Sequence, residues 1–232
     1  MCILRIFCTF AADFIWGTMR IAIIGYGKMG HIIEGIALKR GHEVVCIIDQ
    51  DRLEAWSQID KADVAIEFTT PATAEANIRK AWESGVPVVC GTTGWNSQAL
   101  LEEDKRLHCQ PMLVWKSNFS VGVNMFFELN KDLAAMMQNQ PQYTPSIEEI
   151  HHIHKLDKPS GTAKTLAEDI VERRKSKVES DLPIESVREG EVPGTHIVTW
   201  DSPEDTIVIT HIAKGREGFA LGAVLAAEEL KR

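Results

Sequence analysis

The chain has 232 residues, of which 44% are hydrophobic and 25% are charged, and its formal net charge is −8. This length is enough for one large domain or two small ones, each with a real core. The acidic balance argues against a nucleic-acid-binding protein. No run approaches the ~18 uninterrupted apolar residues of a membrane span. The five cysteines contain no C-x-x-C pair, so we expect free thiols in a reducing, cytoplasmic compartment.

The segment 1–18 is apolar and precedes a second methionine, Met19. One interpretation is a secretory signal, because an arginine near the start is followed by an apolar run. Against it, Asp13 interrupts that run, and Met19 directly precedes the first predicted strand. We therefore expect an over-long start site, with Met19 as the natural initiator and with residues 1–18 dispensable for fold and catalysis.

From Met19 onward, short apolar runs alternate with helical patterns, which is typical of a parallel sheet in an α/β domain. The predicted strands of this region are Arg20–Ile24, Glu43–Ile48, Val64–Phe68, Val86–Cys90 and Met112–Trp115. The predicted helices are Met29–Arg40, Ala72–Ser84 and Ser97–His108. This order predicts a doubly wound dinucleotide-binding domain of the Rossmann type over residues 19–118.

After Asn118 the pattern changes, and strands no longer alternate regularly with helices. A long helix is predicted over Gly122–Met137 and a second over Thr162–Ser176; the extended runs are Ser146–His154, Ile184–Arg188, His196–Trp200 and Thr206–Ile212. We interpret residues 119–212 as an inserted α+β domain. The closing helix, Phe219–Lys231 within about 213–232, is expected to return to the first domain.

The segment Gly25–Gly30 has the form G-x-G-x-x-G between a predicted strand and a predicted helix. Glycines there let the turn close and let backbone N–H groups approach a pyrophosphate at the helix N-terminus. Asp49 ends the second strand about 20 residues further on, where a carboxylate meets the adenosine ribose hydroxyls. The alternative is an ordinary glycine-rich turn. The strand–turn–helix context favours a dinucleotide site.

Two further loops of small residues follow predicted strands directly. Phe68–Pro71 follows the third strand and Gly91–Gly94 the fourth. Ligands of open α/β sheets bind at the carboxyl edge of the strands. We therefore expect these loops and the glycine-rich turn to form one crevice.

The segment Glu149–Ala163 carries the most distinctive polar pattern, EIHHIHKLDKPSGTA. If His151–Lys155 is extended, the side chains of His151 and Lys155 lie on one face and form a proton-transfer pair. Ser160-Gly161-Thr162 then opens a helix and offers N–H groups and hydroxyls to a carboxylate. Two alternatives stay open: an exposed polar strand with a cap at Ser160, and a metal site. The metal site is disfavoured by the adjacent lysine and by the H-H-x-H spacing.

The same segment resembles the signature of the dihydrodipicolinate reductase family, roughly E-x-H-H-x-x-K-x-D-x-P-S-G-T-A. It departs from the commonest form only at Lys158, where alanine is usual. The resemblance continues through Gly25–Gly30, Phe68–Pro71, Gly91–Gly94, Asn118–Asn124 and Arg216–Ala223, and it spans nearly everything from Met19 to the terminus.

The resemblance implies a Rossmann domain and a mixed-sheet domain that binds substrate and forms a homotetramer. It implies that NADH or NADPH reduces a small dicarboxylate, the cyclic imine dihydrodipicolinate, to tetrahydrodipicolinate in lysine and diaminopimelate biosynthesis. His151 would be the acid/base residue and Lys155 the proton donor, while His152, Ser160, Gly161 and Thr162 would hold the substrate carboxylates. The expected cofactor-binding residues are Gly25, Tyr26, Gly27, Lys28, Met29, Gly30, Asp49, Phe68, Gly91, Thr92, Thr93, Lys116, Ser117, Asn118 and Phe119. No metal, membrane or nucleic-acid partner is expected.

One departure from the family pattern concerns the cofactor. Only about fourteen residues separate Asp49 from Val64, so the adenine pocket or the sheet edge is expected to be trimmed. We expect NADH to be used at least as well as NADPH, because a carboxylate at Asp49 would repel a 2′-phosphate. Two other functions remain open, a different Rossmann dehydrogenase and a dinucleotide-sensing module. The histidine segment argues against both.

Overall fold

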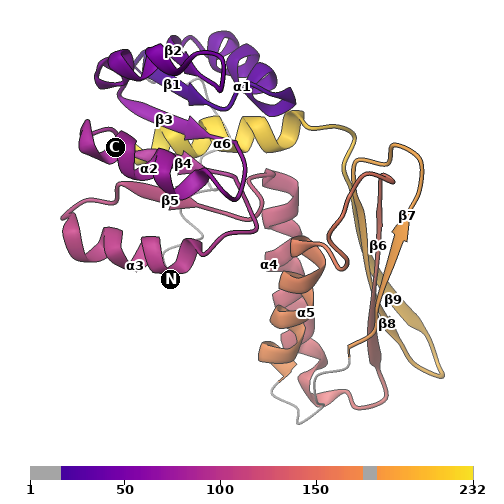
Figure 1. Ribbon diagram of the computed structural model, residues 1–232. Coiled ribbons are helices and arrows are strands. Elements are labelled where there is room, and N and C mark those ends of the chain that lie inside the picture. The colour runs from indigo at the N-terminus through magenta and orange to yellow at the C-terminus, as the bar shows by residue number, and fades with distance from the viewer. Residues whose placement is uncertain (1–16, 175–181, 232) are drawn as a thin grey trace. The chain divides into compact units, whose positions relative to one another are not determined.

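The computed structural model describes residues 17–174 and 182–231 (Figure 1), so nearly all of segment 1–18, with the expectation attached to it, lies outside the described residues. The chain forms two compact units. The first runs up to Val121 and resumes at Glu217, and the second is Gly122–Arg216. The sequence placed these boundaries after residues 118 and 212, a few residues earlier in each case.

The first unit contains a five-stranded parallel sheet in the order β2-β1-β3-β4-β5. Its strands are β1 (Arg20–Ile24), β2 (Glu43–Ile48), β3 (Val64–Glu67), β4 (Val88–Cys90) and β5 (Leu113–Trp115). Every residue of β3 and β4 is buried. Such continuous burial explains why these runs lack polar alternation, since both faces of a parallel sheet are covered. The order changes direction at β1 and β3, which is the switch point where ligands of such sheets bind.

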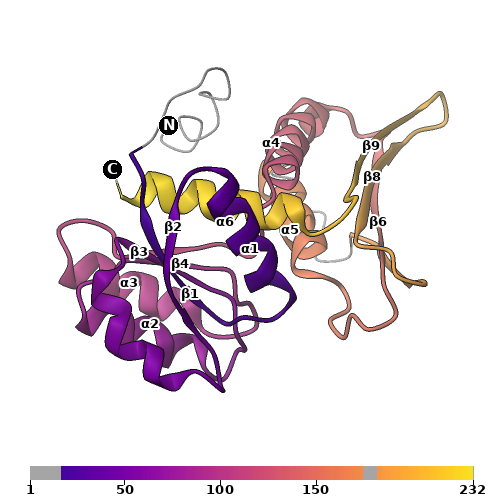
Figure 2. The same ribbon diagram turned by 90° about the horizontal axis from the view of Figure 1, so that it is seen from above.

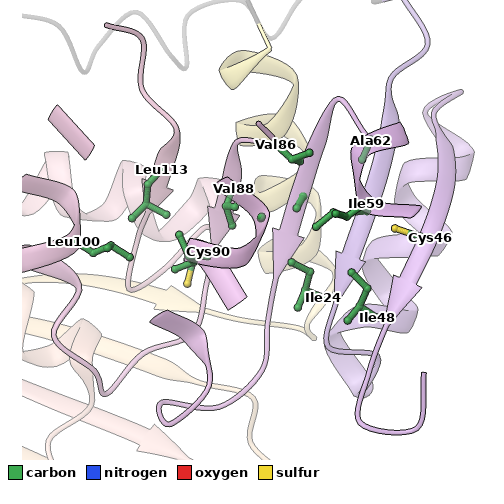
Figure 3. Close-up of a cluster of buried hydrophobic side chains, with 14 residues drawn as sticks. Ile24, Cys46, Ile48, Ile59, Ala62, Val86, Val88, Cys90, Leu100 and Leu113 are labelled. Carbon is green, nitrogen blue, oxygen red and sulfur yellow. The ribbon is translucent and has the colours of Figure 1, made fainter. Parts of the chain in front are cut away.

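Helices cover both faces of this sheet (Figures 1 and 2). The helices are α1 (Lys28–Lys39), α2 (Ala74–Glu83), α3 (Ser97–Leu107) and α6 (Glu217–Leu230). Alternate residues of the strands, among them Ile24, Ile48 and Val88, form one core cluster with residues of α2 and α3 (Figure 3). The intervening residues pack with α1 and α6. Each fully buried aliphatic side chain contributes about 1.5–3 kcal/mol, so the sheet is held from both sides.

Between β2 and β3 the chain forms only a 3₁₀ segment, η1 (Leu53–Lys61), which the sequence analysis did not predict. Its Ile59 is buried and Trp56 packs against the same core cluster. The short connection leaves β2 at the edge of the described sheet.

An ion pair with a buried carboxylate fixes α6 within the first unit. The Arg40 guanidinium donates to both oxygens of Glu228, at 2.6 and 2.9 Å. His42 Nε2 lies 2.9 Å from the same carboxylate. Close packing adds to this, because a Cβ on Gly222 would lie 1.7 Å from the carbonyl oxygen of Phe119. The last helix therefore completes the fold of the first unit.

The second unit has a four-stranded mixed sheet in the order β7-β6-β8-β9. Strands β6 and β7 are parallel, whereas β6–β8 and β8–β9 are antiparallel. Two helices, α4 and α5, lie against one face of the sheet (Figure 1) and bury Phe126, Leu166 and Ile170 with Val198 and Trp200. The elements are α4 (Val121–Met136), η2 (Met137–Asn139), β6 (Thr144–His151), α5 (Gly161–Arg174), β7 (Ile184–Arg188), β8 (Thr195–Asp201) and β9 (Thr206–Ile212). Within the described ranges, no helix is long and apolar enough to span a bilayer.

Candidate functional site

The glycine-rich turn lies between β1 and α1, as predicted. Gly25 has φ +94°, and a Cβ there would lie 2.2 Å from the carbonyl oxygen of Phe68. A Cβ on Gly30 would lie 2.4 Å from the carbonyl oxygen of Gly25. Both positions require glycine. By contrast, a Cβ on Gly27, the N-cap of α1, would meet nothing within 4 Å. The space beside the helix N-terminus is therefore open, as a bound pyrophosphate requires.

Asp49 follows β2 and faces this turn. Its Oδ2 accepts the Tyr26 N–H at 3.1 Å, and its Oδ1 accepts the Gln50 N–H at 2.8 Å. These bonds fix the carboxylate at the carboxyl edge of the sheet. Arg52 lies nearby, with its guanidinium carbon 5.1 Å from the centre of the Tyr26 ring. The tyrosine hydroxyl in turn donates to Glu34 on α1.

Thr92 joins two of the predicted cofactor loops. Its Oγ1 accepts the Thr69 N–H at 2.8 Å, which connects the loop after β3 to the loop after β4. Its carbonyl oxygen accepts two indole N–H groups, from Trp95 and Trp115, each at 2.8 Å. Sequence reasoning missed both tryptophans. Tryptophan is usually read as core packing, and nothing in the pattern indicates a donor to a loop carbonyl.

The remaining predicted cofactor residues follow β3, β4 and β5. A Cβ on Gly91 would lie 2.1 Å from the ring of Phe68, so this glycine makes room for the aromatic side chain. Phe119 is buried, Lys116 is half-buried, and burial lowers the pKa of its amine. All the predicted dinucleotide positions thus follow the five strands of one parallel sheet, at their common carboxyl edge. These residues fit a bound NADH or NADPH.

In the second unit, β6 ends at His151, and the predicted extension to residue 154 is wrong. The next residues form a turn, in which the Lys155 N–H donates to the His152 carbonyl at 3.1 Å. The Ile153 N–H donates to the Gly190 carbonyl at 3.1 Å, beyond β7. The chain therefore leaves the sheet directly after His151. His151 and Lys155 do not share a strand face, and the turn between them carries Lys155.

Strand β6 lies between β7 and β8, so residues of both strands lie close to His151. His151 pairs with Arg188 of β7, and Glu149 pairs with His196 of β8. The Glu149 side chain is 0% exposed, and its Oε2 lies 3.3 Å from His151 Nδ1. This is an ion-pair distance without the geometry of a hydrogen bond. On the other side of the imidazole, a Cβ on Gly194 would lie 3.0 Å from His151 Nε2. Glycine there leaves Nε2 unobstructed.

Glu149 is held as a carboxylate. Burial alone would raise its pKa, but contacts from His151, Ser160, Ser186 and Arg188 outweigh that effect and hold the pKa well below its usual range. His196 is perturbed in the same direction for a different reason. Burial, followed by the neighbouring His151, lowers the pKa of His196 to about 3. At neutral pH the cluster therefore contains a fixed negative charge and an uncharged imidazole.

Lys155 forms an ion pair with Asp157, two residues further along the chain. Its Nζ lies 2.7 Å from Asp157 Oδ1, and the lysine side chain is 24% exposed. Burial would raise the pKa of Asp157, but the lysine outweighs it and lowers that pKa. The Lys155 ammonium is thus held on the turn while it stays partly open to solvent.

The start of α5 lies beside the same cluster. Ser160 is buried, its N–H donates to Glu149 Oε1 at 3.0 Å, and its Oγ accepts the Ala163 N–H at 3.2 Å. Gly161 and Thr162 form the first turn of α5, whose N–H groups suit an anion. His152 is half-buried next to the turn; burial, then the charge of Arg216, lowers its pKa. Arg216 is thus an additional cation near a predicted carboxylate ligand.

Glu149, His151 and His196 also have ligand atoms within 4.8 Å of one another, a spacing that a metal ion could use. The Arg188 guanidinium opposes this, because its Nη2 lies 3.0 Å from Glu149 Oε1. A dication on the other carboxylate oxygen would lie close to this cation. The residues therefore suit a proton-handling cluster better than a metal centre.

Three residues of this cluster were not assigned a role from the sequence: His196, Arg188 and Gly194. They lie more than thirty positions from His151, and only the pairing of β6 with β7 and β8 brings them to it. Glu149 was part of the quoted pattern without an assigned role. Its position two residues before His151 in a strand, on the same face, is the one signal that could have identified it.

Comparisons with known proteins agree for both parts of the chain from residue 19 onward. Residues 19–119 match the model of the N-terminus of dihydrodipicolinate reductase, and residues 122–232 match that of its C-terminus. A 4-hydroxy-tetrahydrodipicolinate reductase of Christiangramia forsetii is 48% identical over 223 residues, which cover 92% of each chain. The protein of that name from Archaeoglobus fulgidus is 37% identical, over 90% of this chain and 93% of its own.

A solved structure shares the fold. The dipicolinate-bound dihydrodipicolinate reductase from Paenisporosarcina sp. TG-14 superimposes with a TM-score of 0.72 at 22% identity, covering 92% of this chain and 94% of that one. At this identity the likeness concerns the fold alone. The two family models and the relatives at higher identity decide the assignment: the chain belongs to the dihydrodipicolinate reductase family.

Proposed function

We propose that this chain catalyses the NAD(P)H-dependent reduction of dihydrodipicolinate, formed by loss of water from 4-hydroxy-tetrahydrodipicolinate, to tetrahydrodipicolinate. This reaction belongs to lysine and diaminopimelate biosynthesis. The observation that carries the proposal is the 48% identity, over 92% of each chain, to a relative named for this activity. The glycine-rich turn of the first unit and the His151 cluster of the second support it, because the reaction needs a dinucleotide site and a proton donor.

The substrate is a cyclic unsaturated imine with two carboxylates. When bound, the nicotinamide cofactor supplies a hydride. Addition of that hydride at C4 of the substrate moves electron density toward C3 as an enamine, and a proton from the protein then completes the reduction. The residues of this chain therefore have two tasks: they hold the carboxylates and they deliver one proton.

We assign the proton delivery to Lys155 and His151. The Lys155 ammonium carries protons on a partly exposed turn, where Asp157 orients it at 2.7 Å. His151 ends a central strand beside a buried carboxylate, which favours an N–H at Nδ1 and leaves Nε2 directed away from Glu149. We assign the carboxylates to Ser160, Gly161 and Thr162 at the start of α5, and to His152. Backbone N–H groups at a helix N-terminus bind anions without any change of protonation.

The test is a coupled assay with the product of dihydrodipicolinate synthase. Lys155→Ala and His151→Ala should each lower kcat by roughly 10²–10⁴-fold, the usual contribution of a positioned acid. NADH binding, measured by fluorescence, should stay nearly unchanged. His152→Ala should raise the substrate KM at least as much as it lowers kcat. Lys158→Ala, at an exposed lysine three positions further on, is the matched control. Retention of more than half of the wild-type kcat by Lys155→Ala would refute the assignment.

We infer that NADH is used at least as well as NADPH. A ribose 2′-hydroxyl can donate to the Asp49 carboxylate, whereas a 2′-phosphate would be repelled by it. Gln50 brings no positive charge, although Lys28 and Arg52 offset the repulsion in part. The kcat/KM values for the two cofactors decide the matter. A tenfold advantage for NADPH would contradict the inference.

We infer a homotetramer assembled through the sheet of the second unit. The described edge strand β9 carries exposed apolar side chains, including Val208 at 52% and Ile212 at 64% exposure. An exposed apolar edge strand is a ready surface for pairing with another copy. Size-exclusion chromatography with light scattering should give a tetramer, and Val208→Glu should dissociate it. A monomeric wild-type protein at micromolar concentration would contradict this inference.

We infer a cytoplasmic enzyme that acts on small molecules, without nucleic-acid or membrane partners. Cys46 and Cys90 are buried free thiols and Cys109 is an exposed one, which fits a reducing compartment. Cell fractionation checks the location: recovery of the protein in the membrane or secreted fraction would contradict it.

A further inference from the structure

One buried ion pair contacts three parts of the proposed site: His151, the turn that carries Lys155, and Ser160 at the start of α5. It consists of Glu149 in β6 and Arg188 at the end of β7, with Arg188 Nη2 3.0 Å from Glu149 Oε1. The two side chains are 0% and 9% exposed. Pairing a buried charge reduces its desolvation cost but seldom makes it a net source of stability. A pair buried to this extent therefore points to a role in positioning the groups that it contacts.

The two carboxylate oxygens of Glu149 face different groups. Oε1 accepts the Ser160 N–H at 3.0 Å and so fixes the residue that caps α5. Oε2 lies 3.3 Å from His151 Nδ1 and 3.9 Å from His196 Nε2. His196 Nε2 is also within 3.2 Å of Ser160 Oγ. One carboxylate is thus in contact with both the proposed acid and the proposed carboxylate cradle.

Arg188 extends the same arrangement to the turn that carries Lys155. Its Nε donates to the Lys155 carbonyl at 3.2 Å, and its Nη2 donates to the Asp157 carbonyl at 2.5 Å. These bonds hold the backbone on both sides of residue 156. A lysine could not make them, because its single ammonium lacks the planar set of donors that a guanidinium has.

We propose that the Glu149–Arg188 pair is a positioning element that keeps His151, Lys155 and the start of α5 in register with one another. This inference rests on the proposed function, because it takes His151 and Lys155 as the proton-handling residues. Glu149 sets the tautomer of His151: a carboxylate at Nδ1 favours the Nδ1–H form and leaves Nε2 for the substrate. Arg188 sets the place of Lys155. Neither residue is assigned a direct contact with the substrate.

Glu149→Gln removes the negative charge of this side chain while keeping its size and shape nearly unchanged. The amide oxygen can still accept from Ser160 and Arg188, but its NH₂ group then faces His151 Nδ1 and opposes a proton there. We expect kcat to fall about 10–100-fold, less than the roughly 10²–10⁴-fold loss expected when a positioned acid itself is removed, while the substrate KM changes less than threefold. Glu149→Asp should recover part of kcat. Arg188→Lys, which keeps the charge but loses the carbonyl contacts, should also lower kcat. Glu148→Gln, at a half-buried residue of the same strand, is the matched control and should leave kcat unchanged.

A second measurement does not depend on turnover. Nitrogen-15 chemical shifts of the His151 ring in the free protein report which ring nitrogen carries the hydrogen. They should indicate the Nδ1–H form in the wild type and in Glu148→Gln, and a shift toward the Nε2–H form in Glu149→Gln. If Glu149→Gln does not fold, the Glu149→Gln/Arg188→Gln double variant carries the same two measurements, because removing both charges of a buried pair is better tolerated.

The outcomes are distinguishable. An inactive wild-type protein would overturn the proposed function and not the positioning of His151, which the ring shifts still test. Wild-type activity together with a kcat within threefold in Glu149→Gln would overturn the positioning proposal. So would an unchanged His151 tautomer in that variant.

Discussion

His196 makes the stability of the second unit depend on pH. It lies in β8, is 4% exposed, and has Nε2 3.2 Å from Ser160 Oγ. Burial, followed by the nearby His151, lowers its pKa to about 3. In the unfolded chain the same imidazole has a pKa near ~6.5. The folded protein therefore holds a neutral histidine over a range in which the unfolded chain binds a proton.

The sign and size of the effect follow from this difference. Above about pH 6.5 both states carry a neutral His196, and the residue adds no pH dependence. Below that pH the unfolded state gains a proton that the folded state lacks, so the free energy of unfolding falls by about 1.4 kcal/mol per pH unit. At about pH 4.5 the loss is roughly 2–3 kcal/mol. That is a large part of the stability of a typical domain.

His196→Gln removes the titration and keeps a polar partner for Ser160. Urea unfolding of wild type and variant between about pH 8 and pH 4.5 should give curves that converge toward acid, with the difference in free energy of unfolding changing by about 2 kcal/mol. Amide hydrogen exchange in β6 and β8, corrected for intrinsic rates, assigns the effect to the second unit. His154→Gln, at an exposed histidine in the turn, is the control and should keep the wild-type slope. Parallel curves for wild type and His196→Gln would refute the reasoning.

Four further outcomes are expected. Burial raises the pKa of Asp169 to about 6, so the contribution of this carboxyl to stability is lost as the pH rises through about 4–6. Asp169→Asn should therefore raise the free energy of unfolding near pH 8 by roughly 1–2 kcal/mol. No gain in urea unfolding would contradict this. Burial raises the pKa of the Cys46 and Cys90 thiols. A thiol reagent followed by peptide mapping should therefore label exposed Cys109 and spare these two buried residues. Labelling of Cys90 in the folded protein would contradict this prediction. Glu228→Gln should cost about 1–3 kcal/mol because it weakens the charge-assisted hydrogen bonds that a buried carboxylate makes with Arg40, and a thermal shift within error of wild type would refute it. Dialysis against EDTA should leave activity unchanged, and activity lost on dialysis and restored by zinc would instead indicate a metal centre.

The first unit could be predicted closely because its elements are decided locally. Arg20–Ile24 is an apolar run followed by the glycine-rich turn, and Glu43–Ile48 is an apolar run followed by Asp49. Both strands have the predicted bounds. The segment Leu53–Lys61 was missed although Leu53, Trp56 and Ile59 are spaced three residues apart, which is the period of a 3₁₀ helix. The burial of Ile59 against the sheet holds it in place.

The end of β6 shows how tertiary contacts override a local pattern. In the run from His151 to Lys155, polar side chains flank a single isoleucine, which predicts a strand. In the structure, the Ile153 N–H instead finds its acceptor at Gly190, beyond the end of β7. That bond depends on the parallel pairing of β6 with β7, and the residues near Ile153 contain no signal that predicts it. Local sequence therefore singled out the residues that we propose as proton-handling, but not the geometry that joins them.

The different environments of His151 and Lys155 fit the different tasks that we propose for them. His151 ends a strand with neighbours on both sides and is 7% exposed, so its ring has little freedom. Lys155 lies on a turn, with its side chain 24% exposed and paired to an acid that is itself about half open to solvent. A residue that must recover a proton after each turnover needs access to water, whereas one that orients the reacting atoms needs a fixed position. The Glu149–Arg188 pair contacts the first residue through its carboxylate and the backbone of the second through its guanidinium. The backbone at Lys155 is thus held by Arg188, while the side chain stays partly exposed and paired with Asp157.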